Sequence, residues 1–470
     1  MAEETLDRAA EGAQRLRGRP LAVTLLAGAL VASGFLLQGA LGVRAAPGGS
    51  PDPSLSGAWF CPHGGSEGWE GWVAVTNPNT TSVLVRLTTF GSKGVLARST
   101  FEVPPSTQVQ RSVPAGEPGA ATEVEYFGGW VGAGTVVRTH SSPPSSAASR
   151  CAASPSRRGF VTDANTASGA TAYLIVMNPF AQAATFDVTI RTDKRPPVRP
   201  GSLSPLVLPA RSSTAVKLDD FVLQAPTERL VTADVSVTVG RAVAGGLVVS
   251  GSGVRAEVAQ SDPATRWVLP AGKYSGTSTI TVVNASSRRA DLEVVAQGAS
   301  SQKALPGVSN VSVGAGSVRA IDVEPSSVGL VLRSTNGVPV VAARRLTGTG
   351  GDVATEAGAN RAGTGWMILP SESPSGGKSF LVLENPGDRT AHVALRFLGR
   401  SGPIQARGVD RVDVPAGRTI VVDLSVSTGK KPISVVVTAA GESVVAASAS
   451  YPGGGAGYTA TLGEPIPRAR

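Results

Sequence analysis

The sequence has little of the material from which metal, redox and nucleophilic sites are built. Its 470 residues include three histidines, two cysteines and three methionines, and only 16% are charged. So few cysteines exclude a disulfide-dense miniprotein. The 57 glycines and 34 prolines make up under a fifth of the chain, below the roughly 25–30% typical of low-complexity disordered chains. Collagen, coiled coils and multi-span membrane proteins are excluded as well, which leaves a globular protein of several domains.

One long uncharged run is present near the start of the chain. Residues 21–43 carry no charge, and a helix of about 20 residues suffices to cross the hydrocarbon core of a bilayer. Arg15, Arg17 and Arg19 precede this run, and positive charge favours the cytoplasmic side. The sequence therefore predicts a cytoplasmic tail at 1–20 and a transmembrane signal anchor at 21–43.

A cleaved signal peptide is the alternative interpretation of the same run. Ala45 and Ala46 would then supply the small-residue exit, although the apolar core exceeds the 7–15 residues usual for such peptides. In both interpretations the chain beyond the linker at 44–56 is extracytoplasmic. We therefore expect a single-pass membrane protein with its C-terminal region outside, or a secreted protein if cleavage occurs.

The two cysteines agree with export. Cys61 and Cys151 both follow the apolar run, and an oxidising compartment lets such a pair form a disulfide. Two unpaired buried thiols are the alternative. A metal site would need two further ligands at suitable spacing, and none is evident. The sequence thus predicts a Cys61–Cys151 disulfide, no metal and no cofactor.

Internal repetition is the strongest signal in the chain. Four apolar segments each end in an asparagine, and these asparagines are 101, 106 and 101 residues apart. Residues two and four before each asparagine are apolar, as are residues eight and ten after it, a period-two alternation that predicts strands. The four asparagines are Asn77, Asn178, Asn284 and Asn385.

Each repeat also opens with an aromatic residue and holds a second landmark 27–31 residues after its asparagine. The opening aromatics are Trp59, Phe160, Trp267 and Trp366. About seven short strands per hundred residues predict a β-sandwich, and a propeller blade of four strands would be shorter. We expect an all-β fold with four tandem immunoglobulin-like β-sandwich domains, at 57–150, 151–258, 259–354 and 355–462.

The start of the first repeat and the Asn-Pro segments resemble a known family. Trp59-Phe60-Cys61-Pro62 and the Asn-Pro pairs of repeats one, two and four are similar to those of exported, membrane-anchored actinobacterial proteins of unknown function. Repeat three departs from the pattern, with Asn284-Ala285. The resemblance implies a location in the cell envelope and a non-enzymatic architecture, and it supplies no catalytic residue.

Candidate functional residues are few. His63 lies near Glu67 and Glu70, which permits a metal or catalytic interpretation, but a position in a polar loop is the simpler expectation. The first repeat holds four of the six tryptophans, and exposed aromatic rings stack on sugars or anchor protein partners. The predicted ligand-binding residues are Trp69, Tyr126 and Trp130.

These observations lead to one expected function and one alternative. We expect a non-catalytic structural or interaction protein of the cell envelope, whose partners are envelope proteins or cell-wall glycans. The alternative is a glycan-binding module array that uses the aromatic residues of the first repeat. A hydrolase would need convergent ionisable residues. The net charge of +9 is dispersed, so nucleic-acid binding is not expected.

Overall fold

The structure is a computed structural model that describes residues 56–164, 169–221, 230–251, 253–270, 276–305, 307–324, 329–348, 352–372, 375–406, 408–452 and 457–467. The chain divides into two compact units, Met1–Pro51 and Asp52–Arg470, and everything below concerns the second. The predicted tail, span and most of the linker lie outside the described residues. Within the described ranges no helix is long and apolar enough to cross a membrane.

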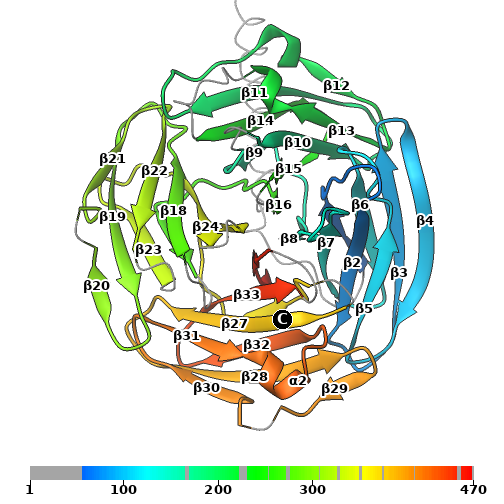
Figure 1. Cartoon of the computed structure of the whole chain (residues 1–470), viewed down its shortest axis with the longest axis vertical. Helices are drawn as coiled ribbons and strands as arrows, with labels where there is room; N and C mark the ends of the chain where they lie inside the picture. Colours follow the sequence, from blue (N-terminus) through cyan, green and yellow to red (C-terminus); the bar gives the residue numbers. More distant parts are fainter. Residues whose placement is uncertain are drawn as a thin grey trace, which may run out of the picture. The chain divides into compact units, whose positions relative to one another are not determined.

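The expectation of an all-β fold is confirmed. The described residues form antiparallel sheets, and the helical elements among them are α2 (Leu424–Thr428) and the short 3-10 turns η1 (Gly201–Leu203) and η2 (Leu218–Phe221). The sheets come in four sandwich-like pairs, which we number along the chain (Figure 1). In each pair, the A-sheet holds the first strand and the B-sheet holds the second.

Pairs 1 and 2 have the same strand order. The A-sheet of pair 1 has the order β1-β6-β3-β4 and its B-sheet the order β5-β2-β7-β8. The strands of pair 1 are β1 (Ser56–Cys61), β2 (Glu70–Asn77), β3 (Val83–Gly91), β4 (Gly94–Val103), β5 (Thr107–Val113), β6 (Ala121–Phe127), β7 (Gly132–Arg138) and β8 (Ser146–Arg150). Those of pair 2 are β9 (Arg158–Val161), β10 (Thr171–Asn178), β11 (Ala184–Thr192), β12 (Leu206–Leu208), β13 (Ser212–Lys217), β14 (Val231–Val239), β15 (Val243–Ser250) and β16 (Gly253–Val258).

Pairs 3 and 4 repeat this order with small additions at the sheet edges. The strands of pair 3 are β17 (Arg266–Leu269), β18 (Gly276–Val283), β19 (Ala290–Gln297), β20 (Gln302–Ala304), β21 (Val311–Val313), β22 (Val318–Val323), β23 (Gly329–Ser334), β24 (Val341–Gly348) and β25 (Val353–Ala357). Those of pair 4 are β26 (Gly365–Ile368), β27 (Gly377–Asn385), β28 (Ala391–Gly399), β29 (Gly402–Ile404), β30 (Arg411–Val414), β31 (Arg418–Asp423), β32 (Ser434–Ala440), β33 (Val445–Pro452), β34 (Thr459–Leu462) and β35 (Glu464–Pro465).

The strand order differs in one respect from that of an immunoglobulin domain. In the immunoglobulin constant-type order the first strand lies beside the second. Here the first strand pairs with the sixth, as β1 does with β6, and the seventh pairs with the second, as β7 does with β2. The outer strands of each pair have therefore changed sheets, while the central pairings of second with fifth and third with sixth remain.

The four repeated asparagines tie two distant turns together in each pair. All four side chains are fully buried. Each Nδ2 donates both to the carbonyl four residues on and to a carbonyl 26–31 residues on, and each Oδ1 accepts from the backbone N–H two residues on. Asn284 makes the same bonds without the proline. The asparagine, and not the Asn-Pro pair, is therefore what the turn requires.

The opening tryptophans have a similar role inside the A-sheets. The indole Nε1 of Trp59 donates to Val131 O at 2.7 Å, that of Trp267 to Val340 O at 2.7 Å, and that of Trp366 to Val444 O at 2.8 Å. Phe160 does not belong to this set. It bridges Gln260 as Phe60 bridges Ala152, so it faces the neighbouring pair. A one-residue shift places a strand side chain on the opposite face, which separates Phe160 from the tryptophans.

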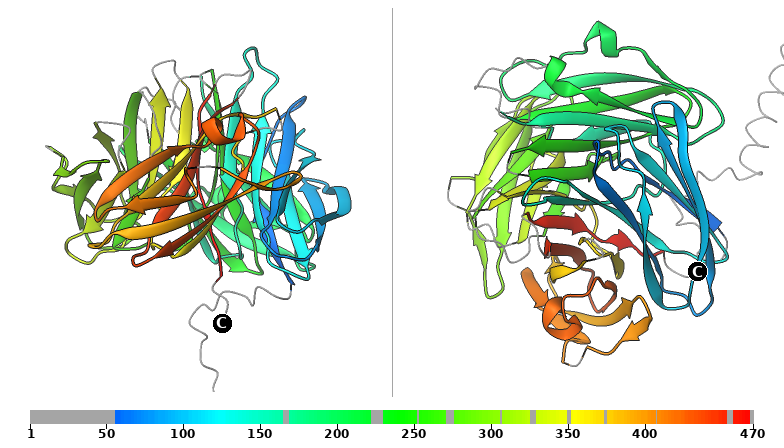
Figure 2. Two further views of the ribbon diagram at one scale, coloured as in Figure 1. Left: turned by 90° about the horizontal axis from the view of Figure 1, so that it is seen from below. Right: turned by 45° about the vertical axis from the view of Figure 1, so that its right-hand side comes forward.

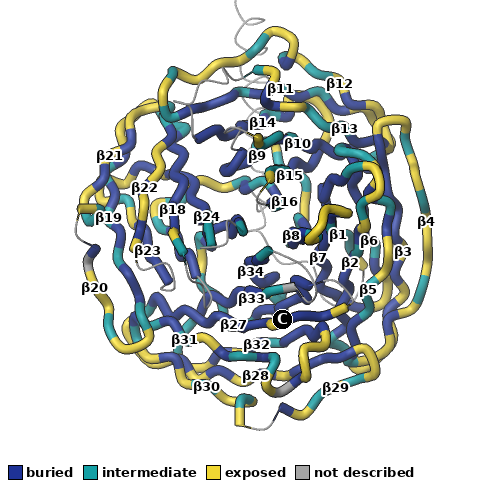
Figure 3. The backbone as a smooth tube through the Cα atoms, viewed as in Figure 1, coloured by how far each residue is buried: buried dark blue, intermediate teal, exposed yellow. Residues whose placement is uncertain are grey.

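The four pairs close into a ring within the second unit, as Figures 1 and 2 show. The last strand of each B-sheet lies at the centre, where β8 contacts β16, β16 contacts β25, β25 contacts β34, and β34 contacts β8. The A-sheet of one pair faces the B-sheet of the next: Phe60 packs on Met177, and Phe160 packs into the core of pair 3. The inner strands are buried, and exposed residues gather on the outer strands such as β4 (Figure 3).

Ring closure depends on contacts between the first and last pairs. Met367 and Leu369 belong to the hydrophobic core of pair 1. Thr76 Oγ1 and Ser434 Oγ are 2.6 Å apart, and Gln108 Nε2 donates to Pro432 O at 3.1 Å. A Cβ added to Gly132 would lie 2.7 Å from Met367 Cγ. The absence of a side chain at this glycine lets the two sheets approach closely.

Candidate functional site

A cleft of about 490 Å³ lies between pairs 3 and 4. Its lining residues are Arg266, Gln302, Arg333, Pro386, Gly387, Asp388, Ala416 and Gly417. One wall is the outward face of the A-sheet of pair 3, which supplies the two arginines. The other wall consists of the two turns of pair 4 that the Asn385 side chain ties together. The site is thus built where two pairs meet, not inside one sandwich.

The two arginines project from neighbouring strands. Arg266 on β17 and Arg333 on β23 are directly paired in the antiparallel ladder, and residues so paired lie about 4.5–5.5 Å apart between Cα atoms with side chains on the same face. Trp267 and Leu332, the next pair along, face the core of pair 3. The alternation of the strands therefore directs both guanidinium groups out of the sandwich and toward the cleft.

Arg266 is held in place by the opposite wall. Its Nη2 donates to Pro386 O at 2.6 Å, while its buried Nε has no hydrogen-bond partner. Arginines cross other interfaces in a similar way: Arg191 Nη1 donates to Gly316 O at 2.8 Å, and Arg396 Nη2 donates to Pro78 O at 2.9 Å. A guanidinium bonded to a turn carbonyl of the next pair is thus a recurring contact of the ring.

A buried carboxyl group lies beneath the cleft. Glu384 is fully buried and neither carboxyl oxygen has a hydrogen-bond partner. It lies against Gly329, where an added Cβ would be 2.7 Å from Glu384 Cδ. Burial raises the pKa of Glu384 well above its ordinary value, while Arg344 opposes the shift. Burial disfavours the charged form of this carboxyl, while the nearby Arg344 and Arg266 favour it.

Among the residues that line the cleft, arginines outnumber carboxylates. Burial, and then the neighbouring charge of Arg333, lower the pKa of Arg266. Arg333 is exposed and makes no hydrogen bond or ion pair with the described residues. Asp388, at the cleft, is 94% exposed and lies 4.0 Å from Arg389. Two cations thus face the cleft, with one solvated carboxylate at its edge.

A second ionic cluster surrounds the buried Asp163 carboxylate. Asp163 Oδ2 accepts from Arg255 Nε at 2.9 Å and from Thr355 Oγ1 at 2.6 Å, and Asp163 Oδ1 lies 3.3 Å from Arg345 Nη1. Burial alone would raise the pKa of Asp163, but Arg255 and Arg345 outweigh it and the net shift is downward. Arg345 and Thr355 belong to pair 3, so this cluster joins pairs 2 and 3.

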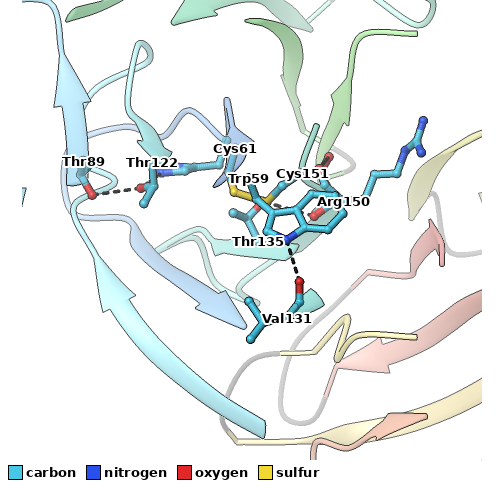
Figure 4. The surroundings of a disulfide bond; sticks show 10 residues. Trp59, Cys61, Thr89, Thr122, Val131, Thr135, Arg150 and Cys151 are labelled. Atoms are coloured by element: carbon cyan, nitrogen blue, oxygen red, sulfur yellow. Dashed lines mark hydrogen bonds between the residues drawn. A yellow bond between two sulfur atoms is a disulfide. The ribbon is translucent and has the colours of Figure 1, made fainter. Parts of the chain in front are cut away.

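The predicted disulfide is present. Cys61 and Cys151 are bonded, with Cα atoms 4.5 Å apart, and both are buried. Figure 4 shows the bond beside the Trp59 indole and its hydrogen bond to Val131. It connects the end of β1, in the A-sheet, to the residue after β8, in the B-sheet. The disulfide thereby fixes both sheets of pair 1 to each other.

The three predicted ligand-binding aromatics do not form a common surface. Trp130 is 3% exposed and packs edge-on against Trp59, with ring centroids 6.1 Å apart. Tyr126 is also buried, in the same core. Trp69 is partly exposed and packs with Val137 in a cluster that joins pairs 1 and 2. Two of these three rings are thus core residues, with little ring surface open to a sugar.

His63 lies in the loop after β1, as expected, and its side chain is buried there. Its Nδ1 is 2.8 Å from Gly64 O and its Nε2 is 3.0 Å from Thr122 Oγ1. Burial lowers the pKa of His63 to about 4. Among the described residues no group of three or more His, Cys, Asp or Glu side chains is placed to hold a metal ion. The histidine is occupied by structural hydrogen bonds.

The cleft residues were not identified from the sequence. Arg266 and Arg333 are 67 positions apart, and each reads as an isolated basic residue beside an apolar strand. The available signal was that each arginine lies next to a core residue in the sequence: Arg266 beside Trp267, and Arg333 beside Leu332. That signal shows an outward orientation, but only the strand pairing shows that the two arginines are neighbours.

The fold and site define a ring of paired antiparallel sheets with a cationic cleft between two of the pairs. The chain belongs to a family of unknown function, DUF5719, which matches residues 121–374 and 362–465. No curated protein matches the sequence. The sequence analysis also expected a family of unknown function, and this match assigns no activity to the chain.

Two of the solved structures that resemble this chain are only distantly similar to it. A Thermotoga maritima protein, 1070, is 17% identical, covers 23% of this chain and 96% of its own, and has a TM-score of 0.20. The Bacteroides ovatus mixed-linkage glucan utilization locus protein SGBP-B, solved with a heptasaccharide, is 8% identical over 77% of this chain and 88% of its own, with a TM-score of 0.12. Scores this low carry no argument about fold or function.

Proposed function

We propose that this chain is a membrane-anchored, extracytoplasmic protein of the cell envelope that acts by binding and contact, without catalysis. The observation that carries the proposal is the buried Cys61–Cys151 disulfide. Structural disulfides form and persist in oxidising compartments and are rare in the cytosol. Export through the apolar run at 21–43 would place the ring in such a compartment.

The distribution of charged groups supports a structural role for the ring. The Asp163 cluster lies between pairs 2 and 3, and Asp163 is saturated by Arg255, Arg345 and Thr355. The guanidinium groups of Arg191 and Arg396 are bonded across other interfaces. Ionisable groups engaged in this way hold the pairs in register, and catalysis instead needs groups directed at a reacting atom.

The envelope proteins or cell-wall glycans expected as partners would meet the outer strands, where exposed residues gather (Figure 3). The glycan alternative rested on Trp69, Tyr126 and Trp130, and the burial of the last two does not favour it. We therefore propose a platform that presents a rigid ring outside the membrane. Its anchor would keep that ring close to the bilayer.

Site-directed cysteine labelling of intact cells tests the proposal. Val426→Cys places a thiol on an exposed residue of α2, whose side chain is 82% exposed. A membrane-impermeant maleimide should label this variant in intact cells. The matched control is Ala10→Cys in the predicted tail, which should react only after lysis. Labelling of Val426→Cys only after lysis would contradict an extracytoplasmic ring.

The same labelled samples distinguish an uncleaved signal anchor from a cleaved signal peptide. An uncleaved anchor predicts that the Ala10→Cys protein sediments with membranes and retains its full mass. Cleavage predicts loss of the introduced thiol with the leader. Either result leaves the ring outside the cytoplasm, while a full-length protein that never sediments with membranes would contradict the anchor.

A further inference from the structure

We infer that the cleft between pairs 3 and 4 binds an oxyanion, the phosphate or carboxylate group of a ligand, through Arg266 and Arg333. This inference goes beyond the proposed envelope role and does not depend on it, because it concerns the charge and shape of one cleft. The cleft volume of about 490 Å³ lies within the roughly 300–1,000 Å³ of small-molecule sites. The ligand group would enter between the arginines and the turns of pair 4.

The first argument is the unneutralised pair of cations. Arg266 and Arg333 are directly opposite each other in the ladder, and like charges in that position are destabilising. Glu293 is also paired with Arg333, but no ion pair joins them among the described residues. Glu384, which lies near Arg266, is fully buried, and burial disfavours its charged form and raises its pKa. An anion from outside would supply the missing countercharge.

The second argument is positioning. The bond from Arg266 Nη2 to Pro386 O, at 2.6 Å, fixes this guanidinium against the far wall. Arg333 is exposed at the cleft and free of protein partners in the described part of the chain. A guanidinium offers a planar fork of donors that matches carboxylate and phosphate oxygens. One fixed and one accessible arginine thus form a preorganised site for two anionic oxygens.

The remaining lining residues permit entry of a ligand. Gln302 adds a neutral amide, while Gly387 and Gly417 add no side chain to the opposite wall. A Cβ at Gly417 would lie 3.2 Å from Gln302 Oε1. Asp388 is the one carboxylate in the lining. Its negative charge repels an anionic ligand, so a variant that removes this charge tests whether the bound ligand is an anion.

Titration calorimetry on the purified full chain tests the inference with two probes, inorganic phosphate and tri-galacturonic acid. Wild-type protein should bind at least one of them saturably at one site. Arg333→Gln should weaken that binding at least tenfold, because it removes the accessible guanidinium. Asp388→Asn should tighten it severalfold, because it removes the opposing charge. Arg98→Gln, an exposed arginine on β4, should bind as wild type does.

The two probes distinguish the possible sources of the anion. Saturable binding of phosphate assigns a phosphoryl group, and saturable binding of tri-galacturonic acid assigns a carboxylated glycan. The inference is overturned if neither probe saturates, or if Arg333→Gln and Arg98→Gln reduce binding equally. Arg266→Gln serves as a second variant, and its unfolding midpoint shows whether the interface remains intact. The location of the ring does not affect these measurements, so failure here leaves the envelope proposal standing.

Discussion

Asn385 and Val414, 29 residues apart, are joined by a hydrogen bond of 2.8 Å from Asn385 Nδ2 to Val414 O. The same Nδ2 donates to Arg389 O at 2.7 Å, and Oδ1 accepts from Gly387 N at 3.0 Å. One buried amide therefore satisfies backbone groups of two turns that are far apart in the sequence. This contact shapes the pair 4 wall of the cleft.

Removal of this amide should destabilise the protein. Asn385→Ala removes the partner of the buried Val414 carbonyl and of the half-buried Arg389 carbonyl and Gly387 N–H, at a cost of about 3 kcal/mol in the free energy of unfolding. Urea unfolding of the full chain measures the change. The control is Asn336→Ala, which loses bonds to Arg289 O and Asp291 at an exposed site and should cost less than about 1 kcal/mol. Equal losses in the two variants would show that burial of Asn385 does not matter.

The Asp163 cluster should depend on the charge of Asp163. Asp163→Asn leaves the buried Arg255 and the half-buried Arg345 without their carboxylate, and breaking a buried ion pair such as Arg255–Asp163 costs about 3–5 kcal/mol. The denaturant midpoint of the variant should fall accordingly. Asp413→Asn removes an exposed partner of His392 and should change the midpoint little. A wild-type midpoint for Asp163→Asn would refute the role of the cluster in joining pairs 2 and 3.

The stability of the protein should decrease from pH 5 to pH 8. Burial raises the pKa of Glu372 and Glu257 to about 7, and that of Glu356 and Glu464 to about 8, from a reference value of 4.5. A carboxyl with a raised folded-state pKa stabilises fully below its unfolded pKa, and this stability is lost as the pH rises through the folded pKa. The lowered pKa of Asp163 acts in the opposite direction: below about pH 4, its contribution to stability is lost as the pH falls.

Glu372→Gln isolates one of these groups. The variant should flatten the decline of the melting temperature between pH 5 and pH 8 by an amount equivalent to as much as about 3 kcal/mol. Glu67→Gln, a surface change, should leave the decline as it is. Melting curves at several pH values measure both. A wild-type protein that melts higher at pH 8 than at pH 5 would contradict the assignment.

Ring closure should be sensitive to a single methyl group. Gly132→Ala places a Cβ 2.7 Å from Met367 Cγ, and overpacking of this kind costs about 1–3 kcal/mol. Gly116→Ala is the matched control, because nothing lies within 4 Å of its added Cβ. The two variants are compared by their melting temperatures. A Gly132→Ala protein as stable as the control would mean that the contact of pairs 1 and 4 is loose.

Local sequence patterns were sufficient for the strands and their turns. The alternation of apolar residues around Asn77 and Asn385 follows from the two-residue period of a strand, and the buried amides explain why asparagine recurs. The pattern failed at Phe160, where an aromatic residue appeared to match Trp59 but lies one position out of register. A two-residue period cannot show which face of the sheet is which when consecutive residues of the strand, such as Phe160 and Val161, are both apolar.

The cleft and the ring could not be predicted from the sequence because they depend on contacts between distant residues. Arg266 meets Arg333 only through strand pairing, and Gly132 meets Met367 only because the fourth pair returns to the first. For Trp130 the sequence pattern suggested a surface position, but the side chain is buried. Its glycine-rich surroundings suggested exposure, whereas the ring packs on Trp59.

The return of the fourth pair to the first changes how the protein would come apart. In an open repeat array the terminal repeats have one neighbour and fray first. In this protein every pair is held on two flanks, so detaching any one of them breaks two interfaces at once. Denaturation should accordingly be more cooperative than in a linear chain of the same modules. No sheet pair is expected to unfold before the others in the way that a terminal repeat does.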